Sequence, residues 1–369
     1  MTNVPQKIQA WQMIRPWSKN KETGEVIEGK LARVELPVPE LKEGEALVRI
    51  AGCGLCHTDL GYFYESVRTV NEPPLVLGHE ISGTVVAGPK EAMGKDVLIP
   101  AVLPCNDCPI CAMGRGNRCL AQQMPGNSMG AQGGFASHIV VPFRDLCVIE
   151  DLKGKPLSHY SVVADAATTP YQAAVRADLT EGDLAVIIGC AGGVGIYMTQ
   201  TASALEAKCV IGIELGAEKL ERAKKFGTNF GIDSTGKTPR DIQSEFREIC
   251  KANGLPHNYG WKIFEVTGSG AGQAIALQLL SFIGKLIVVG FGLQKNEYSI
   301  SRLMAFDAEM IGTWGCLPKY YPKVLELVQT GKIEIDSLLE TRPMSTIQEA
   351  FEQAHSGMLE RRIVLEPDF

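Results

Sequence analysis

Continuous apolar runs alternate with amphipathic stretches through the second half of the chain. The strand-like runs are LAVIIG (184–189), CVIGIE (209–214), WKIFEV (261–266) and KLIVVG (285–290). Strands that are apolar on both faces are typical of sheets covered on both sides. Helical patterns lie between them, for example over 193–205 and 217–226. The alternation predicts a parallel, doubly wound α/β sheet.

Terminal signals mark the ends of two further helices. Thr238 is placed as an N-cap, Pro239 as the first helical residue, and Gly254 lies beyond the end. In STIQEAFEQAHSG (345–357), Ser345 and Gln348 have the spacing of a capping box, which predicts a helix that begins directly after Ser345.

The first 165 residues have a different texture, rich in Gly, Pro and short β-type runs. Those runs are EALVRIAG (45–52), GTVVAG (83–88), KDVLIP (95–100) and FASHIVVP (135–142). Turn residues separate them, which predicts an irregular antiparallel barrel. The last apolar run, RRIVLEP (361–367), is expected to return to this first domain.

Length and composition narrow the class of protein. A chain of 369 residues exceeds one ordinary core, so two domains are expected. The net charge of −6, without a basic cluster, disfavours a nucleic-acid partner. No apolar run is long enough for a membrane span, and MTNVPQKIQAWQ lacks the apolar core of a signal peptide. With 11 cysteines, an odd number, a reducing cytoplasm is expected.

Four cysteines stand within fifteen residues, at Cys105, Cys108, Cys111 and Cys119. Their spacing allows four thiolates to close around one Zn2+ as a tetrahedral structural site. Four cysteines can also hold an iron–sulfur cluster, and buried thiols are often plain core residues. The clustering favours zinc. A closed zinc site stabilises a loop and catalyses nothing, so the chemistry is expected elsewhere.

The turn after the first sheet strand reads GCAGGVG, with Gly189, Gly192, Gly193 and Gly195. Glycine permits a tight turn and lets backbone N–H groups approach a pyrophosphate at a helix N-terminus. The next strand ends at Glu214, whose carboxylate can bind the adenosine ribose and repel a 2′-phosphate. NAD is therefore favoured over NADP. Helix–strand packing alone is the plainer interpretation of the same glycines.

Cys56, in GLCHTDLG, and His79, in LGHE, offer a thiolate and an imidazole. Both are ordinary zinc ligands. Taken singly, each could be structural, and Cys53 with Cys56 makes a CxxC spacing that could indicate redox chemistry. The residues by themselves leave these interpretations open.

The whole chain resembles the zinc-dependent medium-chain alcohol dehydrogenases. The resemblance is carried, in the family's order, by GLCHTD (54–59), GHE (78–80), the four-cysteine segment, DAATTPY (165–171) and the glycine turn with Glu214. It implies a catalytic, zinc-binding GroES-like domain from residues 1–166 and 315–369. It also implies an NAD-binding Rossmann domain at 167–314.

The resemblance implies a second, catalytic zinc whose ligands are Cys56 and His79. Asp165 matches the third ligand, whereas Glu80 matches a carboxylate that lies close to the metal and can enter its shell, so the identity of the third ligand stays open. Asp59 matches an acceptor that orients the ligand histidine. An alcohol at the open position would be acidified like zinc-bound water and would then give hydride to the nicotinamide.

Further roles follow from the resemblance. Thr58 matches the hydroxyl that starts the proton relay. Many members carry a histidine three residues later, but this chain has Gly61, so the relay must end through ribose hydroxyls, His57 or water. The other implied cofactor contacts are Val194, Lys219, Thr169 near the nicotinamide and Arg362 near the pyrophosphate. For Arg362, a plain surface arginine at the start of a strand is an open alternative.

Two unusual stretches, 61–80 and 121–142, resemble family members that act on a coenzyme A thioester. They imply NAD-linked oxidation of a secondary allylic ring alcohol to an enone, and conjugate (1,4-) hydride addition from NADH is a further hypothesis. A free polyol or aromatic alcohol is the alternative, since no cluster of Lys or Arg marks a coenzyme A site. A catalytically inactive, zinc-stabilised binding protein is the alternative from another class. The resemblance also implies a homo-oligomer, with a tetramer favoured over a dimer.

Overall fold

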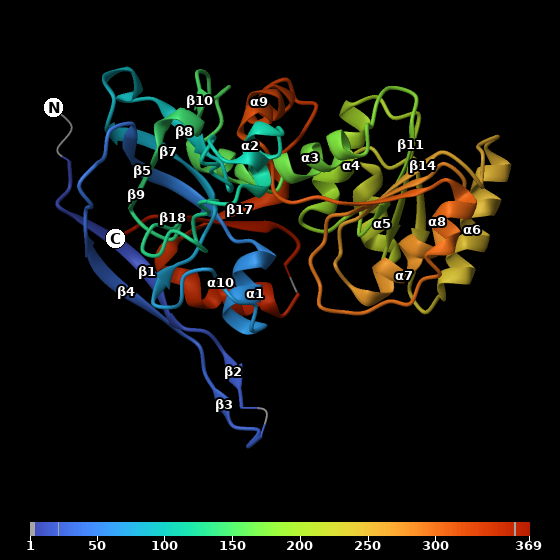
Figure 1. Cartoon of the computed structure of the whole chain (residues 1–369), viewed down its shortest axis with the longest axis horizontal. Coiled ribbons are helices and arrows are strands. Elements are labelled where there is room, and N and C mark those ends of the chain that lie inside the picture. Colours follow the sequence, from blue (N-terminus) through green and yellow to red (C-terminus); the bar gives the residue numbers. More distant parts are fainter. Residues whose placement is uncertain (1–3, 21, 358) are drawn as a thin grey trace. The chain divides into compact units, whose positions relative to one another are not determined.

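A computed structural model of the chain describes residues 4–20, 22–357 and 359–369. It divides into two compact units (Figure 1). Unit 1 is Met1–Thr168, Gly315–Gln329 and Ile335–Phe369, and unit 2 is Thr169–Trp314 and Thr330–Glu334. Each unit has a buried apolar core. Within the described ranges, every helix is too short or too polar to cross a membrane.

Unit 2 is built on a six-stranded parallel sheet. Its strands are β11 (Leu184–Ile188), β12 (Cys209–Glu214), β13 (Phe230–Asp233), β14 (Trp261–Glu265), β15 (Lys285–Val288) and β16 (Glu309–Gly312). They are hydrogen-bonded in the order β13-β12-β11-β14-β15-β16. The order runs outward in both directions from β11, which is the topology of dinucleotide-binding sheets. The predicted doubly wound parallel sheet is confirmed.

Helices connect these strands. They are α3 (Thr168–Arg176), which begins at the unit boundary, α4 (Gly195–Ala204), α5 (Ala217–Lys224), α6 (Pro239–Ala252), α7 (Gly270–Leu279) and α8 (Ser301–Phe306). Helix α6 begins as predicted, with Thr238 as N-cap and Pro239 in the first turn. The Thr238 hydroxyl accepts from the Asp241 backbone N–H at 3.3 Å, and the Asp241 carboxylate accepts from the Thr238 N–H at 2.9 Å. Phe246 on its buried face packs edge-on against Trp261 of β14.

Unit 1 is largely antiparallel. A three-stranded sheet has the order β4 (Lys30–Pro37), β1 (Lys7–Arg15), β6 (Leu75–Val76). A larger sheet contains β5 (Glu45–Gly54), β7 (Glu80–Ala87), β8 (Asp96–Ile99), β9 (His138–Pro142), β10 (Cys147–Ile149), β17 (Leu339–Pro343) and β18 (Arg362–Glu366). The remaining elements are the hairpin β2 (Ser18–Lys19) and β3 (Val26–Ile27), with helices α1 (His57–Tyr64), α2 (Pro109–Ala112), α9 (Tyr321–Gln329) and α10 (Ile347–His355).

Strand β5 is the centre of the larger sheet, because it pairs antiparallel with β7, β9 and β18. At its carboxyl end, Gly54 lies opposite both Glu80 of β7 and Val364 of β18. The final strand therefore returns to the first unit, as its apolar pattern predicted. The pairing brings three segments that are far apart in sequence to one point of the sheet.

The predicted capping box of the last helix is wrong. Helix α10 begins at Ile347, after a short 3₁₀ turn, and its N-cap Thr346 makes no side-chain cap. Ser345 instead donates its hydroxyl to the carboxylate of Asp368 at 2.5 Å, and the Gln348 amide lies 3.5 Å from the carbonyl of Leu31. Partners supplied by the tertiary fold thus replaced the local capping pair.

The cap of α6 gives a test of local stability. We expect Thr238→Ala to lower the free energy of unfolding by about 1 kcal/mol, because one N-terminal N–H loses its acceptor. Thr238→Ser keeps the hydroxyl and is the matched control. Urea unfolding of both variants measures the difference, and equal stability of the two would contradict a capping role.

Candidate active site

The four cysteines of unit 1 form one compact cluster. The Sγ atoms of Cys105 and Cys119 lie 3.3 Å apart, those of Cys108 and Cys111 3.5 Å, those of Cys108 and Cys119 3.8 Å, and those of Cys105 and Cys111 4.0 Å. A tetrahedral zinc with bonds of about 2.3 Å would separate its sulfur ligands by about 3.8 Å. The cluster therefore has the size of a closed zinc–thiolate site.

Backbone groups around this cluster favour thiolates. The N–H groups of Cys105 and Ala121 both point to the sulfur of Cys119, each at 3.3 Å. Backbone N–H groups, that of Leu120 foremost, lower the pKa of Cys108 to about 6. Burial acts in the opposite direction on Cys111 and raises its pKa to about 12, so the surroundings favour the metal-binding thiolate form at Cys108 and not at every sulfur.

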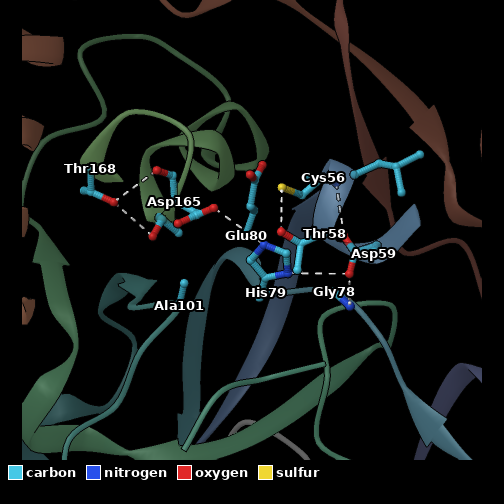
Figure 2. Close-up of polar contacts among 12 residues, drawn as sticks. Cys56, Thr58, Asp59, Gly78, His79, Glu80, Ala101, Asp165 and Thr168 are labelled. Carbon is cyan, nitrogen blue, oxygen red and sulfur yellow. Dashed lines mark hydrogen bonds and ion pairs between the residues drawn. The ribbon is translucent and has the colours of Figure 1, made fainter. Parts of the chain in front are cut away.

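A second cluster lies at the end of β5, formed by Cys56, His79, Glu80 and Asp165 (Figure 2). One ligand atom from each can be chosen so that all four lie within 4.8 Å of one another. Cys56 is the N-cap of α1, two residues beyond the end of β5, and His79 directly precedes β7. Asp165 ends the 3₁₀ helix η4 (Leu157–Ala164). The β5–β7 pairing explains why Cys56 and His79 meet.

Asp59 ties the two ligand-bearing segments together (Figure 2). Its carboxylate accepts from the backbone N–H of Cys56 at 3.1 Å and from that of Gly78 at 3.1 Å. The same carboxylate lies 3.5 Å from Nδ1 of His79. The Asp59 side chain is fully buried, so these contacts act at low dielectric. This geometry is that of an acid that fixes the ring of a ligand histidine.

The side chains of the cluster fit a metal ion, because each of them offers one ligand atom. Among the described residues, neither ring nitrogen of His79 has a hydrogen-bond partner, although the ring is 1% exposed. Nε2 of His79 lies 3.6 Å from the Asp165 carboxylate. Burial opposes a charge on His79, but the surrounding acids, Asp59 first, raise its pKa well above the usual value. A divalent cation among Cys56, His79 and Asp165 would neutralise these acids and give Nε2 a partner.

Glu80 is buried beside the cluster but already has a cation. Nη1 of Arg362, at the start of β18, donates to Oε1 of Glu80 at 2.7 Å. Burial raises the pKa of Glu80 to about 7, against the opposing effect of Arg362. A Cβ at position 54 would lie 2.1 Å from Oε2 of Glu80, so only glycine leaves room for this carboxylate. Sequence reasoning missed the roles of Gly54 and Arg362 here, since no local signal links residues so far apart.

Two candidate proton carriers begin α1. Oγ1 of Thr58 lies 3.7 Å from the sulfur of Cys56. The neighbouring His57 has a side chain that is 77% exposed, with Nε2 3.5 Å from Glu65. Thr58 therefore lies at the cluster, and His57, directly before it, reaches solvent.

The glycine turn of unit 2 has the geometry of a phosphate loop. Gly189 has φ +85° directly after β11, and a Cβ on Gly195 would lie 1.7 Å from the carbonyl oxygen of Gly189. Glycine is thus required at both ends of the turn. Glu214, the last residue of β12, accepts from the N–H of Ala191 at 3.0 Å and from that of Leu215 at 2.9 Å. The acid and the turn are joined directly.

The remaining predicted cofactor contacts lie at separate places. Val194 is the N-cap of α4, and Gly192 and Gly193 lie in the turn before it. Lys219 is on the exposed face of α5, and Thr169 is in the first turn of α3. Arg362, with a side chain 8% exposed, is paired with Glu80, and its predicted contact with a pyrophosphate stays a prediction.

Comparisons with known proteins agree with this geometry. Residues 42–151 match the family described as alcohol dehydrogenase GroES-like domain, and residues 193–330 match zinc-binding dehydrogenase. An NAD-dependent alcohol dehydrogenase of Sulfolobus acidocaldarius is 29% identical over 91% of this chain and 96% of its own length. A sorbitol dehydrogenase of Bombyx mori is 28% identical over 88% and 92%.

A solved structure supports the fold. Galactitol-1-phosphate dehydrogenase from Escherichia coli has a TM-score of 0.82, with 24% identity, and covers 97% of this chain and 100% of its own. A largely antiparallel unit with two clusters of metal-ligand type and a parallel-sheet unit with a glycine turn agree with the two domains that these families describe. The chain belongs to the zinc-binding medium-chain alcohol dehydrogenase family. It is an oxidoreductase of alcohols, and the expected cofactors, zinc and NAD, are confirmed.

The two metal clusters should respond differently to substitution. We expect Cys56→Ala to reduce zinc from two to one per chain and to abolish turnover, while NAD binding and the melting temperature change little. Cys105→Ser should instead destabilise the fold, because the site between loop segments would lose a ligand. Zinc analysis by atomic emission, with thermal unfolding, distinguishes the two. Equal and mild losses from both substitutions would contradict this division.

Glu214 gives a test of cofactor choice. We expect the protein to prefer NAD+ over NADP+, and Glu214→Gln to narrow that preference by about tenfold, equal to about 1.4 kcal/mol. The reason is that the substitution removes the negative charge that would repel a 2′-phosphate. Glu218→Gln, an exposed acid on α5, is the control. The ratio of kcat/KM for the two cofactors is the measurement, and an unchanged ratio in Glu214→Gln would refute the assignment.

Proposed function

We propose that the chain oxidises a secondary alcohol to a ketone with NAD+ as hydride acceptor. The observation that carries this is the cluster of Cys56, His79 and Asp165, because a sulfur, an imidazole and a carboxylate at one place are the ligand types that zinc takes. A bound zinc ion supplies Lewis acidity, which makes the O–H of a coordinated alcohol acidic near neutral pH. Unit 2 supplies the glycine turn for the dinucleotide.

We assign Asp165 as the third protein ligand. Glu80 is engaged by Arg362 at 2.7 Å and is fully buried, so its Oε1 already has a partner. The Asp165 carboxylate is 15% exposed and lies 3.6 Å from the His79 ring nitrogen that faces it. Glu80, paired with Arg362, then lies beside the site without binding the metal. Asp59 orients His79 through Nδ1.

We assign proton release to the start of α1. The alcohol proton passes to Oγ1 of Thr58, whose own proton moves onward. His57, the exposed residue directly before Thr58, or water receives it, because Gly61 offers no side chain to continue the relay. The relay therefore leaves the site by a short route to solvent.

The substrate class is less constrained than the reaction. The relatives described above are named for an alcohol, for sorbitol and for galactitol 1-phosphate, at 24–29% identity. Their names favour a free alcohol or polyol. The three relatives are named for different alcohols although their sequence identities to this chain are similar. The property that they share is therefore the reaction and not the alcohol.

A second substrate class rests on its own observation, the stretches 61–80 and 121–142. In the structure these stretches bind one another: the Asn127 amide donates to the Tyr62 hydroxyl at 2.5 Å, and its Oδ1 accepts from the Val70 N–H at 2.9 Å. A Cβ on Gly126 would lie 2.8 Å from the backbone nitrogen of Gly78, next to His79. The two stretches thus form one wall adjoining the metal cluster.

The stretches 61–80 and 121–142 resemble family members that act on a coenzyme A thioester, and this resemblance supports a more specific proposal. We propose 6-hydroxycyclohex-1-ene-1-carbonyl-CoA as the alcohol and 6-oxocyclohex-1-ene-1-carbonyl-CoA as the product, in anaerobic degradation of benzoyl-CoA. The ketone and the thioester of the product are both conjugated with one C=C. NADH can therefore also add hydride to the ring CH of this double bond, while water protonates the ring carbon that bears the thioester group. The homo-oligomer and the cytoplasmic location stay predictions.

A substrate panel separates the two classes. We expect NAD+ reduction, followed at 340 nm, to be at least a hundredfold faster in kcat/KM with the cyclohexene thioester than with sorbitol or benzyl alcohol, since binding energy from the remote part of a substrate lowers the barrier. Cys56→Ala is the blank for zinc-dependent turnover.

The opposite ranking would assign the protein to free alcohols. A separate incubation of NADH with the enone thioester tests the conjugate addition. Mass spectrometry should show the saturated ring ketone besides the allylic alcohol, and formation of the allylic alcohol alone would rule that reaction out.

A further inference from the structure

A tyrosine far from the cluster in sequence reaches the backbone beside Asp165. Tyr321 is the first residue of α9, and its side chain is fully buried. Its hydroxyl donates to the carbonyl oxygen of Ala164, the residue before Asp165. The same hydroxyl accepts from the backbone N–H of Ala101 at 3.0 Å. One phenol therefore joins the segment after β8 to the end of η4.

A second hydroxyl acts on the same turn (Figure 2). Oγ1 of Thr168 donates to the Ala164 carbonyl at 3.2 Å and lies 3.4 Å from the carbonyl oxygen of Asp165. Thr168 is fully buried. The backbone that carries Asp165 is thus held by two side chains that enter from different elements. Asp165 itself has φ −141° and ψ −53°, so it leaves the 3₁₀ path at this point.

The position of this turn decides where the Asp165 carboxylate lies. The side chain has two rotatable bonds, and its carboxylate faces His79 at 3.6 Å. Ligand groups must be held within about 0.5 Å of their productive geometry, and the groups that hold them usually stand one shell away. His79 has Asp59 for this purpose, and Glu80 has Arg362. The backbone that carries Asp165 is held by the hydroxyls of Tyr321 and Thr168.

We propose that Tyr321 is the positioning residue that fixes Asp165 as the third ligand of the metal cluster. This inference rests on the proposed function, because it takes the cluster to be a zinc site. Only a side chain that donates and accepts at one atom can bridge an N–H and a carbonyl in a dry interior. Phenylalanine would fill the same space but would leave the Ala101 N–H without an acceptor and Ala164 with Thr168 alone.

The test is Tyr321→Phe in the full-length zinc-loaded enzyme, with Tyr160→Phe as the matched control. Tyr160 is equally buried, stands on η4 itself, and donates its hydroxyl to the Leu152 carbonyl at 2.8 Å. Both variants lose one buried hydroxyl. Zinc release into a chromogenic chelator measures the metal site without turnover, and the absorption spectrum of the cobalt-substituted enzyme reports its geometry.

We expect Tyr321→Phe to release the more labile zinc about 10–100 times faster than Tyr160→Phe and to shift the cobalt spectrum, with a loss in kcat larger than the change in KM. Matching release rates and spectra in the two variants would overturn the proposal, since they would show a merely structural hydroxyl. Thr168→Val is the second variant if Tyr321→Phe does not fold, with the same direction and a smaller effect.

The wild-type enzyme distinguishes this inference from the proposed function. Two zinc ions per chain, one released faster than the other, support the catalytic cluster whatever Tyr321 does. One zinc per chain would refute the proposed function and the positioning role together. Two zinc ions with an unaltered site in Tyr321→Phe and Thr168→Val would refute the positioning role alone.

Discussion

The pairing of β5 with β7 is the constraint on which the metal cluster depends. Their register places Gly54 opposite Glu80, so that Cys56, two residues beyond β5, meets His79, one residue before β7. Asp59 then holds both segments through two backbone N–H groups. The strand pairing brings Cys56 and His79 close to one another. The hydrogen bonds to the buried Asp59 then fix their positions as closely as a metal site needs.

The buried carboxylates around the cluster need partners that compensate their charge. Asp59 and Glu80 have fully buried side chains, and Asp165 is only partly exposed. Buried carboxylates without compensation are costly, so each must be paired or neutralised. Arg362 serves Glu80, and backbone N–H groups serve Asp59. Cys56, His79 and Asp165 bring a sulfur, an imidazole and a carboxylate to one place, and these are ligand types that zinc takes.

The two candidate metal clusters of unit 1 differ in the ligands that they offer. The four-cysteine cluster is complete in itself, since four sulfur atoms fill a tetrahedron and leave no position for a substrate. The other cluster brings Cys56, His79, Glu80 and Asp165 together, and Gly126 of the stretch 121–142 packs against Gly78 beside it. The relatives described above share the fold and differ in the alcohol for which they are named.

The sequence by itself determined the features that arise from local pattern. Apolar runs and glycine spacing were enough for the parallel sheet and the turn at Gly189–Gly195, because strand burial and a phosphate loop are encoded within a few residues. Cysteine spacing marked the closed cluster in the same way. The tertiary structure alone decided the contacts between distant segments: Arg362 with Glu80, 282 residues apart, and Tyr321 with Ala164, 157 apart. It also overrode the local capping signal at Ser345, since Asp368 offers that hydroxyl a partner that no local pattern could reveal.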